Sequence, residues 1–127
     1  RFHLLMDKSL PNHYLYKNND LELAIQLWSQ IEKTSDELKE LYAEAQLFLG
    51  ALLEVKEDLI AAAEAYKNVS REDYAELYAW AQWNLCNLTE DDIYLKNIVL
   101  EDDVEMYAKA RFILGVAEAD LRSKYQY

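Results

Sequence analysis

The sequence is poor in glycine, proline and cysteine. Two glycines and one proline among 127 residues leave few of the turn residues that β-sandwiches and barrels need. One cysteine cannot form a disulfide within the chain, which slightly favours a reducing compartment such as the cytoplasm. No apolar run approaches the roughly 20 residues needed to cross a bilayer. We therefore expect a soluble protein without a membrane span.

Basic residues are also scarce. The 13 Lys and Arg residues face 24 Asp and Glu residues, which gives a formal net charge of −11. The bases are scattered along the chain, whereas binding to nucleic acid requires Lys and Arg that neutralise phosphates. We expect no nucleic-acid partner, and the negative field tolerates basic protein partners.

The abundant residues are Ala, Leu, Glu, Lys and Gln, which favour helix and predict an all-α fold. A nine-residue phrase occurs three times and begins at Tyr42, Tyr78 and Tyr107. Its first, second, fourth and eighth residues are always Tyr, Ala, Ala and Leu, and its ninth is always small. The copies begin 36 and 29 residues apart, on either side of the roughly 34-residue period of helical-hairpin repeats.

A second pattern recurs between these copies. Segment 20–31 aligns without gaps on segment 58–69, with Asp, Leu, Ala, an aromatic and a β-branched residue at the same offsets. The Asp can cap a helix start, and the Leu, Ala and aromatic residues form one apolar stripe. These segments are predicted to be the second helices of two hairpins.

Small residues form a stripe on the predicted first helices. Ala43 and Gly50 are seven residues apart and lie on one helix face. Glycine inside a helix costs about 1 kcal/mol relative to alanine, so we expect close packing against the stripe at Ala24 or Ala62. The equivalent pairs in the other copies are Ala79 with Cys86 and Ala108 with Gly115.

Capping-box spacings set the remaining helix boundaries. Three such pairs occur: Thr34 with Glu37, Ser70 with Asp73, and Thr89 with Asp92. They predict helices over about 35–55, 71–88 and 90–100, and a last helix follows over about 102–123. Residues 1–19 form an irregular segment, in which a short helix is predicted from Pro11 to about Lys17, and residues 20–127 form the repeat domain.

Helix pairs with Leu-Gly in the first helix and Ala, an aromatic residue and then Val or Ile in the second resemble the tetratricopeptide repeat family. Leu49-Gly50, Ala62, Tyr66 and Val69 match that family's signature positions. The segment 45–50 is also similar to the Sel1-like subclass of these repeats. The resemblance, which covers about residues 20–123, implies antiparallel helical hairpins stacked as a right-handed superhelix, with the first helices lining a concave groove.

The resemblance also implies which side chains line this groove. They are Glu44, Leu47 and Ala51 in the first copy, Trp80, Trp83 and Asn87 in the second, and Lys109, Phe112 and Val116 in the third. Each set is spaced three and then four residues apart and so shares one helix face. Trp80 and Trp83 lead this set because aromatic residues are enriched at binding hot spots. The alternative is that both pack against neighbouring helices.

Chemistry-bearing motifs are scarce. His3 and His13 have no neighbours at metal-ligand spacing, and the acidic residues of 90–92 and 101–105 lack the glycine and the spacing of an EF-hand loop. These acids predict a solvated edge or a docking patch for a basic partner. Cys86 stands where the other two copies of the phrase have glycine, and we interpret it as a small packing residue. A Gly-rich phosphate loop is absent from the sequence. We expect no catalytic residue, metal or cofactor.

These patterns predict a non-catalytic scaffold that binds a peptide segment or protein partner, apolar and in part basic, through the groove. One alternative is a structural unit that self-associates through its open C-terminal end. An all-α enzyme domain is a further alternative, since carboxylates on adjacent helices can do acid–base work.

Overall fold

The computed structural model describes residues 18–125. All regular secondary structure in this range is helical, as the composition predicts. The elements are α3 (Asn18–Ser29), η1 (Asp36–Leu38), α4 (Lys39–Val55), α5 (Leu59–Lys67), α6 (Ala75–Thr89), α7 (Ile93–Lys96) and α8 (Val104–Tyr125). The helix predicted from Pro11 to Lys17 lies outside the described residues.

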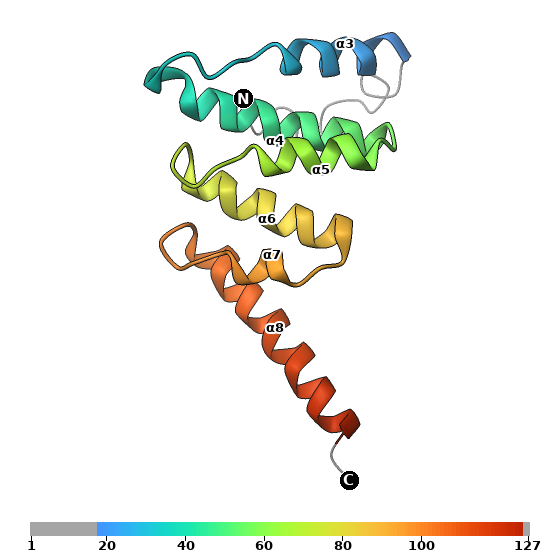
Figure 1. Cartoon of the computed structure of the whole chain (residues 1–127), viewed down its shortest axis with the longest axis vertical. Helices are drawn as coiled ribbons and strands as arrows, with labels where there is room; N and C mark the ends of the chain where they lie inside the picture. Colours follow the sequence, from blue (N-terminus) through green and yellow to red (C-terminus); the bar gives the residue numbers. More distant parts are fainter. Residues whose placement is uncertain (1–17, 126–127) are drawn as a thin grey trace.

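The helices stack in chain order (Figure 1). Consecutive helices run in opposite directions, with α3 at one end of the stack and α8 at the other. Most of α8 extends away from the helices before it, which leaves its C-terminal half without a neighbour among the described elements. None of the helices in the described part of the chain is long and apolar enough to cross a membrane.

Side-chain hydrogen bonds explain where the helices begin and end. Asp58 caps α5 as predicted, because its carboxylate accepts the backbone N–H of Ala61 at 3.2 Å. The predicted helix start at Arg71 is wrong. Ser70 accepts the N–H of Asp73 at 3.3 Å, but these residues form a turn and α6 begins only at Ala75.

The prediction of a helix over 90–100 is also wrong, since only one helical turn, α7, forms in this segment. The Asp102 carboxylate accepts the N–H of Val99 at 3.2 Å, and Arg71 donates to the carbonyl of Asn97 at 2.7 Å. These side chains satisfy backbone groups that a longer helix would otherwise pair. The third predicted start, near Ser35, is a 3₁₀ turn in which the Ser35 side chain makes no capping bond.

Three apolar clusters form the core. The largest joins α4, α5 and α6 through Ala43, Leu47, Tyr66, Val69, Leu77, Ala81 and Leu85. A second joins α6, α7 and α8, and a third lies between α4 and α5. Five of the six constant alanines of the phrase are therefore buried packing residues, as predicted, whereas Ala108 of the third copy is exposed.

Gly50 and Gly115 occupy equivalent positions but meet different surroundings. A Cβ atom on Gly50 would lie 2.4 Å from Cε1 of Tyr66, so the α5 ring fills the space that a side chain would need. This contact confirms the close packing predicted for Gly50. A Cβ atom on Gly115 would meet nothing within 4 Å, because no described helix covers that face of α8.

A hydrogen bond between two side-chain amides occurs at the same place in two successive helix pairs. Gln46 of α4 accepts a hydrogen bond from Asn68 at 3.0 Å, and Gln82 of α6 accepts one from Asn97 at 2.9 Å. Both glutamines are buried, and they occupy the fifth position of the nine-residue phrase. The third copy has Arg111 there, and this side chain is exposed.

A base–tyrosine–aspartate contact also recurs. Lys33 lies 5.5 Å from the centre of the Tyr42 ring and 2.8 Å from the Asp73 carboxylate. In the next unit, Arg71 lies 4.5 Å from the Tyr78 ring and 2.6 Å from the carboxylate of Asp102. Hydrogen bonds to the carboxylates raise the pKa of both bases. These contacts involve the constant first residue of the phrase.

Candidate partner-binding surface

A shallow hollow lies between α6 and α8. Its volume is about 390 Å³, and it is lined by Trp83, Ala108, Lys109, Phe112 and Ile113. Three of the predicted partner-binding residues, Trp83, Lys109 and Phe112, therefore line one surface. We call this surface the α6–α8 hollow.

Phe112 is the most exposed aromatic side chain in the hollow. It is 71% exposed, and α8 holds it there because Met106 and Ala110 anchor the opposite face of the helix in the core. Lys109 is one turn away, and its ammonium lies 3.2 Å from the Glu105 carboxylate in an exposed ion pair. Such pairs contribute little stability, so Lys109 can exchange this partner for another acceptor.

The two tryptophans have different environments. Trp80 is half-buried and packs against both the α4–α6 cluster and the α6–α8 cluster. Trp83 packs against the second cluster and also lines the hollow. The alternative reading, that the tryptophans pack against neighbouring helices, fits Trp80 well, whereas Trp83 takes part in both core and surface.

The other predicted residues do not lie in the hollow. Glu44 and Leu47 are buried within α4, and Leu47 belongs to the largest core cluster. Asn87 and Val116 are exposed, on α6 and α8 respectively. The structure thus brings the second and third predicted sets together at Trp83 and Phe112, and places Glu44 and Leu47 of the first set in the interior, with Ala51 half-buried.

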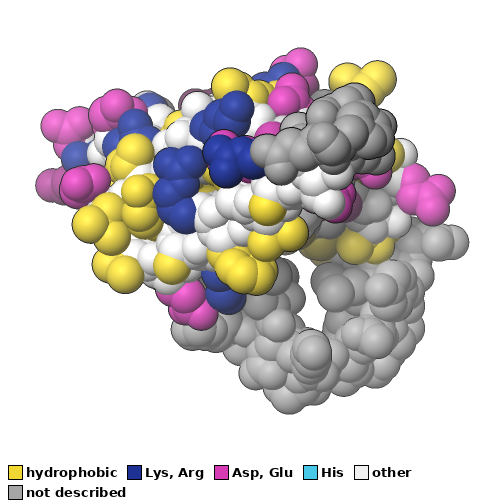
Figure 2. Space-filling view, turned by 90° about the horizontal axis from the view of Figure 1, so that it is seen from below, with side chains coloured by type: hydrophobic (Ala, Val, Ile, Leu, Met, Phe, Trp, Pro, Cys, Tyr) yellow, Lys and Arg dark blue, Asp and Glu magenta, His cyan; other side chains and the backbone are white. Residues whose placement is uncertain are grey.

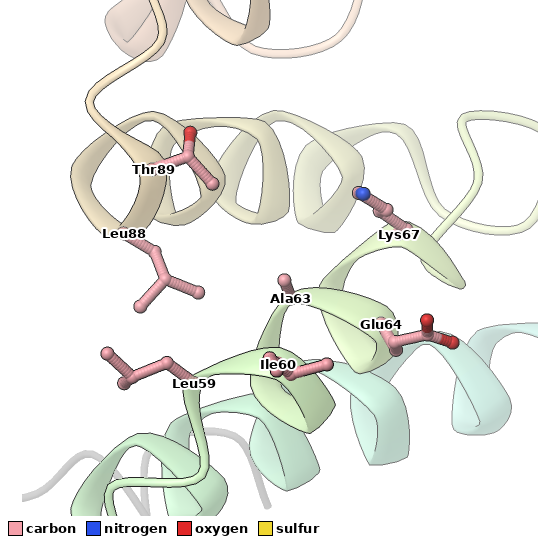
Figure 3. Close-up of a pocket in the computed structure, with 7 residues that line it drawn as sticks. All are labelled: Leu59, Ile60, Ala63, Glu64, Lys67, Leu88 and Thr89. Atoms are coloured by element: carbon pink, nitrogen blue, oxygen red, sulfur yellow. The ribbon is translucent and has the colours of Figure 1, made fainter.

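A second hollow, between α5 and the end of α6, was missed by the sequence analysis (Figure 3). Leu88 points from α6 toward Leu59 and Ala63 of α5, and Glu64 and Lys67 lie at the other end of this hollow. Its volume is about 300 Å³. Ile60 and Thr89 also line this hollow.

Ile60 is 81% exposed beside this second hollow. The signal for it is present in the sequence, because the aligned position in segment 20–31 is the polar residue Glu22. An apolar residue at a position that is polar in the sister helix is exposed to solvent unless a partner covers it.

The acidic segments hold local structure together. Asp91 accepts the N–H of Ile93 at 3.0 Å, and Asp103 accepts the N–H of Met106 at 2.9 Å. Asp102 is nearly fully buried against Arg71. Within residues 18–125, no cluster of His, Cys, Asp and Glu could hold a metal ion. The prediction of a fully solvated edge is therefore wrong for Asp102.

Cys86 lacks the environment of a reactive thiol. Burial raises its pKa, and the carboxylates of Asp92 and Asp91 raise it further. Reactive cysteines have a lowered pKa that favours the thiolate. The half-buried side chain instead packs against the α6–α8 cluster, in line with its prediction as a small packing residue.

The surface at the α8 end is mixed in character. Hydrophobic and basic side chains share the face seen from below, and acidic side chains lie mostly toward its edges (Figure 2). An apolar surface with basic side chains beside it can hold a partner's apolar segment.

Comparison of the chain with protein-family models, curated proteins and solved structures found no match.

Proposed function

We propose that this chain is a non-catalytic module of the tetratricopeptide type, which binds an apolar segment of a protein or peptide partner in the α6–α8 hollow. The observation that carries the proposal is the Phe112 ring, which is 71% exposed beside Trp83 and Lys109. Full burial of such a side chain contributes about 1.5–3 kcal/mol, which makes Phe112 an anchor for a partner.

The recurring polar contacts support the repeat character of the module. The Gln46–Asn68 and Gln82–Asn97 hydrogen bonds each join the two helices of one pair, at equivalent positions in successive pairs. Repeat proteins stack such units through nearest-neighbour contacts and carry binding residues at the positions that vary between units. Trp83, Lys109 and Phe112 are at varying positions of the nine-residue phrase.

Charge indicates the flanks of the partner segment. The chain carries a net charge of −11, so its field attracts basic residues and repels acidic ones. We expect an apolar anchor with basic flanks, in which a single acceptor group reaches Lys109. Trp83 supplies a flat apolar wall on the α6 side.

Affinity capture with three bait proteins tests the proposal. The baits are the wild-type chain, Phe112→Ser and Ile60→Ser. Both variants remove a large exposed side chain, so both should stay folded by circular dichroism. We expect Phe112→Ser to lose a partner that wild type and Ile60→Ser retain. Loss with Ile60→Ser alone would assign binding to the α5–α6 hollow and overturn the proposal.

A further inference from the structure

One face of α8, adjacent to the hollow, is open. Arg111, Gly115 and Glu118 are exposed and follow one another at helical spacing. A Cβ atom on Gly115 would meet nothing within 4 Å. We call these three residues the open face of α8.

The equivalent face of α4 shows what covers such a surface. Residues 46, 50 and 53 of α4 align with 111, 115 and 118 of α8. In α4, Tyr66 lies against Gly50, and Asn68 donates a hydrogen bond to Gln46. Leu53 packs in a cluster with Ala65 of α5. A helix with the residue pattern of α5 therefore covers this face within the chain.

The described chain contains one other helix with that pattern, α3. Ala24, Trp28 and Ile31 align with Ala62, Tyr66 and Val69 of α5. Trp28 packs on Phe48 of α4, with 5.0 Å between ring centres. This contact uses the side of α3 that faces the following helix.

The other side of α3 is exposed. Leu23 and Leu27 are 51% and 54% exposed, and Gln30 is exposed as well. These three residues, the open face of α3, align with Ala61, Ala65 and Asn68. In α5 the aligned residues line a hollow with Gln46, Leu49 and Leu53 of α4. The open face of α3 therefore corresponds to the face of α5 that lies toward the preceding helix, α4.

On the two open faces, the hydrogen-bond donor and acceptor of this polar pair are exchanged between the helices. Where Gln46 accepts from Asn68, α8 carries Arg111, which can only donate. Where α5 carries the donor Asn68, α3 carries Gln30, whose carbonyl oxygen can accept. An Arg111–Gln30 pair would thus restore a hydrogen bond at the same position.

We propose that the open face of α8 binds the open face of α3 from a second copy of this chain. The contact repeats the packing of α4 on α5: α3 lies over Gly115, Leu27 packs beside Leu114, and Arg111 donates to Gln30. The two faces differ, so the contact is heterologous and can extend through several copies. Arg111, Gly115 and Glu118 lie beside the partner hollow and do not line it, and the contact does not rest on the proposed function.

Two single-face variants of the full chain test this contact. Gly115→Leu fills the space on α8 that the incoming helix needs, and leucine forms helix better than glycine, so the variant should stay folded. Leu27→Glu places a charge on the exposed face of α3. Sedimentation velocity of wild type, from micromolar to millimolar concentration, should show a mass that rises with concentration, while each variant alone remains monomeric.

An equimolar mixture of the two variants gives the decisive result. Gly115→Leu keeps an intact α3 face and Leu27→Glu keeps an intact α8 face, so the mixture should form a pair of two chains and nothing larger. A mixture that stays monomeric while wild type associates would overturn the proposal. Wild type that is monomeric throughout, because another molecule or a segment outside residues 18–125 covers these faces, would overturn it as well.

Discussion

Gly50 lies directly against the ring of Tyr66. A Cβ atom at position 50 would lie 2.4 Å from the Tyr66 ring, and the Tyr66 hydroxyl donates a hydrogen bond to the Glu54 carboxylate one turn further along α4. The ring is fully buried and its hydroxyl is hydrogen-bonded, so it has no free space into which it could move. This contact sets how closely α4 and α5 approach.

Gly50→Ala should therefore destabilise the chain. Overpacking of a close contact typically costs about 1–3 kcal/mol, which outweighs the gain of about 1 kcal/mol in helix propensity. Gly115→Ala is the matched control, since its Cβ meets nothing within 4 Å, and it should be neutral or stabilising. Urea unfolding of both variants measures the difference. Equal free energies of unfolding would contradict the contact.

Glu90→Gly should stabilise the chain. Glu90 ends α6 in the left-handed region, with φ 60°, where a side chain costs about 1–2 kcal/mol and glycine fits freely. We expect a gain of about 1 kcal/mol, partly offset by the greater freedom of glycine in the unfolded chain. Glu90→Ala keeps the Cβ atom and should give no such gain in thermal unfolding.

Arg71→Met should lower stability by about 1–3 kcal/mol, because the nearly buried Asp102 carboxylate would lose the two hydrogen bonds that Arg71 donates and keep the one from the Val99 N–H. Arg71→Lys retains the charge, as in the Lys33 contact, but cannot donate in the same forked geometry. It should fall between wild type and Arg71→Met in urea unfolding. Full stability of Arg71→Met would show that the contact is incidental.

Stability should fall steeply above pH 10. Burial and the hydrogen bond to Glu54 raise the pKa of Tyr66 well above its ordinary value of 10.0. Unfolded chains release this proton above pH 10 while folded chains keep it, so rising pH favours unfolding, by about 1.4 kcal/mol per pH unit for one group. Below pH 10 the contribution is fully present. Urea midpoints measured on either side of pH 10 should fall less steeply for Tyr66→Phe than for wild type.

The helical fold was predictable because apolar spacing and repetition determine which faces are buried. Ala43, Ala62 and Leu85 each occupy a recurring apolar position of the repeated segments, and all three lie in the core. The contacts of the constant tyrosines were not predicted, because their partners are distant in sequence: Arg71 pairs with Asp102 across 31 residues. Extending the alignment of segments 20–31 and 58–69 by two residues would have matched Lys33 with Arg71.

Only part of the candidate site was predictable. Helix periodicity placed Lys109 and Phe112 on one face, and the structure sets that face beside Trp83. Burial of Glu44 and Leu47 depends on how α4 is covered by its neighbours, which helix spacing alone does not determine. The exposure of Phe112 likewise arises because the described helices cover α4 but leave this part of α8 open.

The affinity of a selected peptide tests the central claim most directly. A ligand chosen from a random peptide library on immobilised wild type can be labelled, and its Kd measured by fluorescence anisotropy for wild type, Phe112→Ala and Ile60→Ala. We predict that Phe112→Ala weakens binding about tenfold or more, which corresponds to about 1.4 kcal/mol, and that Ile60→Ala leaves Kd unchanged. Equal Kd values for wild type and Phe112→Ala would contradict the account.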